Sequence, residues 1–211
     1  MAAAFFCAAV LTSFAALLAV PSANAAFRAL SVSLPLAMGF VKFVFLATTG
    51  EILAARIGTG LWRVPENAAA KAAVWGVIGA ALALLLKVYA GGVALLFNGG
   101  APLLIAFATS LAMNATFAPV MMTFHKMTDT WLALKAEGAD TSLAAVIGAA
   151  DWYGFISFTV MKTIPFFWLP AHTVTFMLPP EYQTSMAAAL SIVLGIILSL
   201  NKGADRPREE M

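Results

Sequence analysis

“VKFVFLATTGEILAARI”, residues 41–57, is apolar over most of its length but carries Lys42, Glu51 and Arg56. A helix of residues 36–57 is long enough to cross a hydrocarbon core of about 30 Å at a rise of about 1.5 Å per residue. A carboxylate inside such a span costs at least about 2.5 kcal/mol on insertion scales, so Glu51 needs a partner or a polar surrounding. The stretch therefore predicts a membrane-spanning helix whose polar groups face other protein groups.

The composition indicates an integral membrane protein. Of the 211 residues, 62% are hydrophobic and 10% are charged, and the mean hydropathy is +0.92. A soluble domain carries about 25% charged residues, so this chain has too little polar surface to stay in water. The formal net charge of +2 and the scattered basic residues argue against nucleic acid as a partner. The lone Cys7 excludes a disulfide framework and a cysteine-based metal cluster.

Apolar runs of membrane-spanning length recur along the chain, separated by turn residues and charges. The runs are continuous rather than alternating, which favours helices over barrel strands, and helices satisfy their own backbone groups in lipid. We therefore predict an all-α, polytopic membrane helix bundle over residues 36–200, followed by a polar C-terminal tail at 201–211. The five predicted core transmembrane helices are residues 36–57, 70–97, 103–124, 153–178 and 183–200.

Residues 1–26 are typical of a secretory-type targeting segment, because an apolar run is followed by Pro21 and by the small residues “ANAA” at 23–26. No Lys or Arg precedes the apolar run, which argues against a secretory signal and against a mitochondrial presequence. Two interpretations stay open: a cleaved targeting segment and an extra membrane helix.

The basic residues between the spans predict the orientation of the bundle. With five crossings, Arg28 alone lies on one side, while the connections at 58–69 and 125–152 and the C-terminus share the other side. This asymmetry follows the positive-inside rule, so we expect the second side to face the cytoplasm, stroma or matrix. Its basic residues are Arg56, Arg63, Lys71, Lys126, Lys135, Lys202, Arg206 and Arg208.

The lysines within the spans also need a physical reason. Lys42 lies near the outer end of its span, where its ammonium group can snorkel to the interface. Lys87 and Lys162 lie deeper. Glu51 and Lys162 lie at depths that differ by only about 5 Å at helical rise, so we predict that they pair inside the bundle. The alternative is that Glu51 contacts backbone or water near the inner interface.

Further polar residues lie in or beside the spans. Pro119 frees a backbone carbonyl near Asn114, so this segment is either a kink packed by its neighbours or part of a water-filled path. His125 and Asp129 share a helix face if the helix continues to them. Neither His125 nor His172 has a second His or Cys at ligand spacing, so we expect no metal site and no cofactor. No Ser–His–acid arrangement can be assembled, and we predict that the chain is not an enzyme.

Five stretches occur in an order that is familiar from one membrane protein family: “TTGE” (48–51), “AAVWGVIGA” (72–80), “MNATFAPVMM” (113–122), “FFWLPAHTVTFMLPPEY” (166–182) and “LGIILS” (194–199). They resemble the Mpv/22-kDa peroxisomal membrane protein family. Asn114, His172 and Thr175 stand where that family has Asp, Gln and Asn. The positions that carry the resemblance are Gly50, Pro119, Trp168, Pro170, Ala171, Phe176 and Pro179.

The resemblance implies a small helical bundle in an organelle membrane (mitochondrial, peroxisomal or plastid) or in a bacterial inner membrane. Members of the family are channel-like proteins that influence the passage of small metabolites. Glu51 stands at the position of a signature acid, which the resemblance places toward the interior of the bundle.

We therefore expect a small channel- or transporter-like protein for small solutes, with Glu51, Lys87, Asn114 and Lys162 along a narrow polar path. The excess of lysine over glutamate within the spans favours small anions. The expected partners are the lipid bilayer, the solutes, and further copies or other membrane subunits. The alternative is a non-transporting accessory subunit of a larger, pigment-binding complex, because “EILAAR” (51–56) has the Glu-x-x-x-x-Arg spacing of chlorophyll-binding antenna helices.

Overall fold

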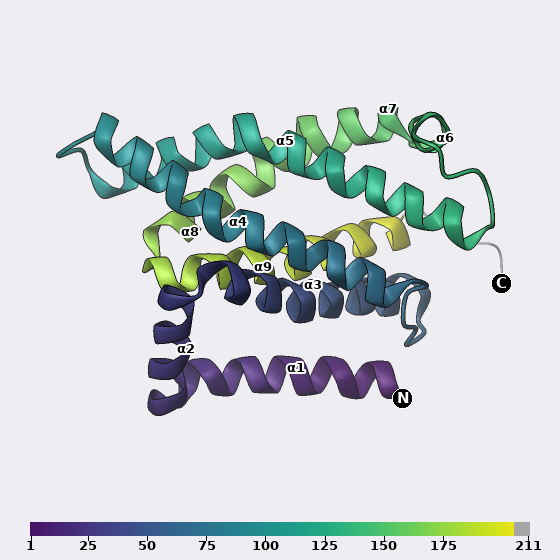
Figure 1. The fold of residues 1–211 in the computed structure, drawn as a ribbon, viewed down its shortest axis with the longest axis horizontal. Coiled ribbons are helices and arrows are strands. Elements are labelled where there is room, and N and C mark those ends of the chain that lie inside the picture. The colour runs from purple at the N-terminus through teal and green to yellow at the C-terminus, as the bar shows by residue number, and fades with distance from the viewer. Residues whose placement is uncertain (205–211) are drawn as a thin grey trace.

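The computed structural model describes residues 1–204, and this part of the chain is helical without a strand (Figure 1). It confirms the predicted all-α bundle. Among these residues, four helices are long and apolar enough to cross a membrane, or five if the bent stretch 143–177 is one span. The four are Ala2–Ala19, Pro35–Thr59, Ala68–Leu96 and Pro102–Ala136, so the N-terminal helix is among them and the predicted span 183–200 is not. The predicted polar tail begins as the last turn of the final helix, and 205–211 lie outside the described residues. The helices are α1 (Ala2–Ala19), α2 (Pro21–Ser33), α3 (Pro35–Thr59), α4 (Ala68–Leu96), α5 (Pro102–Ala136), α6 (Leu143–Ala149), α7 (Trp152–Gly154), the π-helix η1 (Phe155–Trp168), α8 (Leu169–Met177) and α9 (Pro180–Ala204).

Prolines divide the N-terminal part of the chain into three helices. Val20 is extended and precedes Pro21, and Leu34 is non-helical and precedes Pro35. A residue before proline avoids the α-helical region, whereas proline itself fits the first turn of a helix, so each pair ends one helix and begins the next. As a result α2 lies across one end of the bundle, while α1 runs beside α3 (Figure 1). Removal of residues 1–26 as a targeting segment stays a prediction.

Side-chain contacts bind α2 to the start of α9. Arg28 Nη2 lies 2.6 Å from Glu181 Oε1, and the hydroxyl of Tyr182 donates a hydrogen bond to Asn24 Oδ1 over 2.7 Å. The rings of Phe27 and Tyr182 stack with their centroids 6.2 Å apart. The crosswise helix is therefore part of the folded bundle.

Lys42 is buried rather than directed to the interface, so the prediction that it snorkels is wrong. Its side chain is 6% exposed, and Nζ donates to Ser31 Oγ over 2.8 Å. The ammonium also lies 4.4 Å from the ring centroid of Phe27. Both partners belong to α2, which the sequence analysis did not place, and their contacts offset the cost of burying the charge.

The centre of the bundle is α3, which packs most extensively against α4 and α9. Glycines allow the close approach to α4. A Cβ built on Gly39 would lie 2.5 Å from the carbonyl oxygen of Gly79. The small residues therefore bring the two backbones into contact, as they do in membrane helix pairs generally. The main apolar cluster of this region contains Phe43, Leu46, Ala47, Ile78, Leu82, Leu86, Met113, Ala187, Ala188 and Ile192.

Large apolar side chains cover much of the outside. Leu95, Phe166 and Val120 are 84%, 81% and 65% exposed. A water-soluble monomer rarely exposes contiguous apolar surface on this scale, whereas lipid covers it without cost. The outer surface therefore agrees with an integral membrane protein.

Two helices differ from their predicted limits. The helix predicted to end at residue 124 continues to Ala136, and His125 and Asp129 share a face as expected, with Nδ1 and Oδ2 3.7 Å apart. The predicted span 153–178 is η1 followed by α8, and it meets α6 at a bend of 66°. Pro165 lies within η1, where a missing backbone donor favours irregular helical bonding.

The connections that the charge pattern places on one side lie together. The loop between α3 and α4 and the loop between α5 and α6 are at the right-hand end of Figure 1, which we call the inner end. The helix α2 and the turn between α4 and α5 are at the opposite, outer end. Both ends thus have the arrangement that five alternating crossings require.

Candidate functional site

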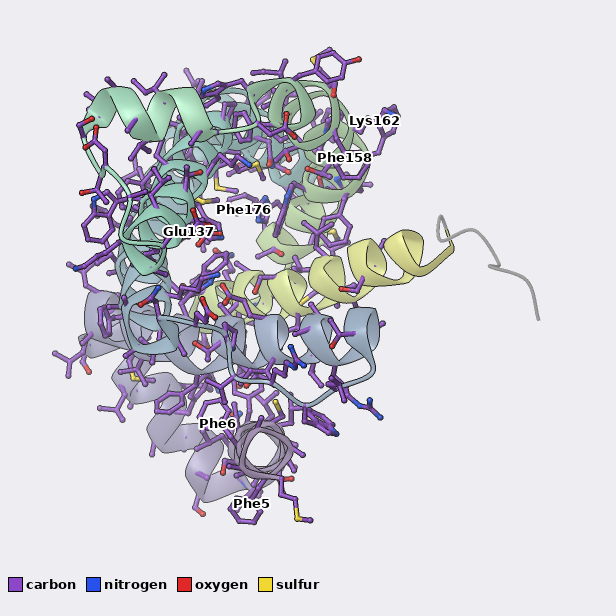
Figure 2. The ribbon with its side chains drawn as sticks, turned by 90° about the vertical axis from the view of Figure 1, so that its right-hand side faces the viewer. Phe5, Phe6, Glu137, Phe158, Lys162 and Phe176 are labelled. Carbon is purple, nitrogen blue, oxygen red and sulfur yellow. The ribbon has the colours of Figure 1, made fainter. Side chains whose placement is uncertain are left out.

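A cavity of about 600 Å³ lies inside the bundle, between α3, α4, α5, η1, α8 and α9. Figure 2 looks along the bundle from its inner end into this region. Pro65 lines the inner end of the cavity and His172 lines the deep end. Toward the outer end the interior is filled, because Leu86, Met113 and Asn114 are each at most 2% exposed. The cavity is therefore an inward-facing chamber.

Five side chains form what we call the rim cluster: Glu51, Lys71, Trp75, His125 and Asp129. Trp75 Nε1 donates to Glu51 Oε1 over 2.7 Å, which is a short, charge-assisted hydrogen bond. The rings of Trp75 and His125 meet edge to face with their centroids 4.3 Å apart. The cluster joins α3, α4 and α5 at the mouth of the chamber.

Lys71 lies between the two carboxylates of the rim cluster without a close bond to either. Its Nζ is 3.9 Å from Glu51 Oε2 and 3.8 Å from Asp129 Oδ1. Both distances exceed the hydrogen-bond range, and all three side chains are partly exposed, so the pairs contribute little to stability. Among the described residues, no acceptor takes a hydrogen bond from Lys71 Nζ, and these protons are available to an occupant of the chamber.

A second polar group lies at the deep end of the chamber. The rings of Trp168 and His172 stack with their centroids 5.2 Å apart. Asn114 Nδ2 lies 3.1 Å from His172 Nδ1 and donates to the Ser110 carbonyl over 2.9 Å. Ser110 Oγ donates to the Leu169 carbonyl over 2.7 Å. These bonds connect α5 to α8 and hold the histidine ring against the chamber.

One buried donor of the deep group has no partner. Trp168 is 9% exposed, and its Nε1 makes no hydrogen bond within the described residues. An indole N–H can only donate, and a buried donor without an acceptor costs about 1–3 kcal/mol. Trp168 lines the chamber, while its Nε1 is itself enclosed by protein atoms.

The predicted path residues separate into two groups. Glu51 lines the chamber, and Asn114 lies directly behind its deep end. Lys87 and Lys162 are exposed on the outside, and Figure 2 shows Lys162 beside Phe158 on the outer side of η1. The predicted pair of Glu51 and Lys162 is not formed. Equal depth was the only basis for that pairing, and depth does not decide which side of a helix faces inward.

The residues that carry the family resemblance lie as follows. Gly50 lines the chamber and packs against α9, since a Cβ there would lie 3.1 Å from Ile192 Cα. Phe176 is partly buried against the main apolar cluster. Pro119 lies within α5, Pro170 in the first turn of α8, and Pro179 directly before α9.

Several polar residues that line the chamber were not among the predicted path residues: Lys71, Trp75, Lys126, His125, Asp129 and His172. A signal for the first two exists in the sequence. Lys71, Trp75 and Gly79 are spaced four apart and share one helix face, and the glycine marks that face as the one packed on α3. Lys126 lies beyond residue 124, where its span was predicted to end. The sequence analysis therefore did not place Lys126 on the helix that lines the chamber.

Hydrogen bonding in the rim cluster makes a prediction about coupling. The variants Glu51→Gln and Trp75→Phe should show an interaction free energy of about 1 kcal/mol in a double-mutant cycle of unfolding in detergent. The same cycle between Glu51→Gln and Lys162→Met should be additive within about 0.5 kcal/mol, because the lysine points away from the chamber. Coupling to Lys162 instead of Trp75 would contradict the geometry of the rim cluster.

No known protein family, curated protein or solved structure matches this chain. The resemblance to the Mpv/22-kDa family therefore stays a prediction. Within residues 1–204, no three His, Cys, Asp or Glu side chains gather into a group that could hold a metal ion. Glu51 and Arg56 make separate contacts, the first with Trp75 and the second with the ring of Trp62 at 5.8 Å. The alternative of an accessory, pigment-binding subunit stays a prediction.

Proposed function

We propose that this chain is a small transporter-like membrane protein that moves small solutes across the bilayer. The chamber carries this proposal, because charged side chains line the mouth of a cavity within a bundle whose outside is apolar. Ionisable groups inside membrane bundles generally mark substrate or ion pathways. A chamber that is open toward one end and filled toward the other fits a carrier with alternating access better than a continuous pore.

The charges of the chamber do not support the anion preference that the lysine count suggested. Lys87 and Lys162 are on the outside, and Lys42 contacts α2 rather than the chamber. The chamber itself is lined by two carboxylates and two lysines, Glu51, Asp129, Lys71 and Lys126. A formally balanced lining favours solutes without net charge.

Blocking the chamber tests the proposal. Ser191 lines it, so a cysteine at this position in a Cys7→Ser background should react with a membrane-impermeant, charged thiol reagent added from the inner side. In proteoliposomes loaded with glycine, glycerol or acetate, we expect the modification to remove most of the protein-dependent flux, because the adduct fills the chamber.

The matched control places the cysteine on the outside. Val88→Cys in the same background lies on an apolar surface and is 56% exposed, so a lipid-soluble thiol reagent should modify it and leave the flux unchanged. Absence of any protein-dependent flux, or equal block at both positions, would refute transport through the chamber.

A further inference from the structure

We propose that the chamber binds a small monocarboxylate together with one proton, which His125 takes up. The inference rests on the proposed function, since it names a substrate class for the same chamber. Three observations carry it: the unpartnered nitrogen of His125 beside a carboxylate, the balanced charges of the other residues at the mouth, and the apolar wall below them.

One nitrogen of His125 has no hydrogen-bond partner. Nδ1 is enclosed, makes no hydrogen bond within residues 1–204, and lies 3.7 Å from Asp129 Oδ2. The side chain as a whole is 24% exposed and lines the chamber, so a proton can reach the ring through water at the mouth. A protonated imidazole is a donor at both nitrogens, and Nδ1 would then face the Asp129 carboxylate as a charged donor.

The charges around His125 oppose this proton while the chamber holds no anion. The other charged residues of the lining are Glu51 on α3, Lys71 on α4, and Lys126 and Asp129 on α5. Among the described residues, η1 and α9 add no titratable group to the lining, and α8 adds His172 at the deep end. Two carboxylates and two lysines already balance, so a proton on His125 leaves one positive charge in excess.

A bound monoanion removes the excess positive charge. The side chain of Lys71 is 27% exposed and has unused donors, and Lys126 lines the chamber without an ion-pair partner among the described residues. Both lysines can therefore donate to a carboxylate at the mouth. The anion and the proton cancel each other's charge, so each increases the affinity for the other by thermodynamic linkage. Together they add no net charge to the balanced lining.

The wall below the mouth favours an organic anion over an inorganic one. The residues Ala47, Ala54, Met121, Met122 and Phe155 line it. A volume of about 600 Å³ falls within the ordinary range of small-molecule sites, which combine apolar walls with a few polar groups. The carbon atoms of a carboxylate are stabilised when they leave water for this wall, whereas an inorganic anion has no apolar surface to bury.

Butyrate, butyramide and chloride separate these contributions. Butyramide has the shape of butyrate without its charge, and chloride has the charge without the apolar chain. Between about pH 6 and about pH 8 butyrate stays ionised, while histidine is the ordinary side chain that gains a proton. On the purified full chain in detergent, calorimetry should give an affinity for butyrate about tenfold higher at the lower pH, within the limit of about a hundredfold for one proton. The affinity for butyramide should be the same at both pH values.

The same calorimetry counts the proton. Butyrate is titrated at about pH 7 in two buffers that differ in their heat of ionisation, and the difference in the measured heat gives the number of protons taken up on binding. We expect a substantial fraction of one proton with butyrate and none with butyramide. A residue that only supports the structure would not produce this uptake.

Variants assign the proton to a residue. His125→Gln keeps a polar side chain at the mouth, and it should bind butyrate equally at both pH values and without proton uptake. Asp129→Asn gives the lining an excess positive charge before any proton binds, so at the higher pH it should bind butyrate about threefold more tightly than the unmodified chain. Lys162→Met is the matched control on the outside, and it should reproduce the unmodified chain.

The inference is overturned if butyrate does not bind, if it binds without proton uptake, if chloride binds as tightly, or if the uptake persists in His125→Gln. If His125→Gln does not fold, Asp129→Asn decides, and an unchanged butyrate affinity in that variant overturns the inference as well.

Failure of this inference is distinct from failure of the proposed function. Flux that the Ser191→Cys adduct blocks, without proton-linked butyrate binding, leaves transport standing and removes the substrate class. Proton-linked butyrate binding without flux of butyrate or of any other solute leaves the binding site and removes transport.

Discussion

Replacing Gly79 by valine is expected to separate α3 from α4 and to prevent the bundle from reaching its folded state. A Cβ at this position would overlap the carbonyl oxygen of Gly39 and lie 2.6 Å from Phe43 Cβ. One obstacle is backbone, so no change of side-chain rotamer relieves it, and the helices must move apart. Overpacking of a close interior contact costs about 1–3 kcal/mol or more, and here it also opens the main apolar cluster.

The alanine variant measures the same effect on a protein that still folds. Gly79→Ala should lower the free energy of unfolding in detergent by about 2 kcal/mol, and valine should lower it further. Gly92→Ala is the control on the same helix, since a Cβ there meets nothing within 4 Å. Removing a helical glycine there should stabilise the protein by about 0.5–1 kcal/mol. Equal effects at both positions would mean that α3 and α4 are not in backbone contact.

Replacing Asn114 by leucine is expected to destabilise the junction of α5 and α8 by about 2–4 kcal/mol, because the whole hydrogen-bonded network loses its central member. Asn114 is 2% exposed and contacts both the Ser110 carbonyl and His172 Nδ1. Leucine has a similar volume but leaves the His172 ring buried without this partner. Unfolding in detergent measures the loss.

The same chemical change on the outside controls for the substitution itself. Asn98 is exposed in the turn between α4 and α5, so Asn98→Leu should change the free energy of unfolding by less than about 0.5 kcal/mol. A loss at Asn114 no larger than at Asn98 would mean that the network does not contribute to stability.

The fold was predictable because its signals are local. Run length and composition along residues 36–200 determine the helices, and prolines and glycines mark most of the ends. The crosswise helix α2 was not predicted, although Pro21 and Pro35 mark its beginning and the beginning of the next helix. The side chains of α2 bind the ammonium group of Lys42. The prediction that Lys42 snorkels was therefore wrong because α2 itself was not predicted.

The candidate site was only partly predictable, because it depends on the direction of side chains around each helix. Glu51 was identified from the cost of a carboxylate in lipid, and that argument is independent of any partner. Its partners Trp75 and Lys71 come from a neighbouring helix whose rotation only the packing of Gly79 determines. Lys162 follows the first turns of a π-helix, where α-helical spacing no longer predicts which face is inward.

The contacts of α2 also set an order of events for any proteolytic removal of the N-terminus. Residues 23–26 lie within the helix, and Asn24 accepts a hydrogen bond from Tyr182, which is near the opposite end of the sequence. A protease needs unwound backbone, and this segment is wound and anchored once α9 is in place. Cleavage after residue 26 must then precede the arrival of the last helix during synthesis, and the mature fold should protect the same peptide bond from later digestion.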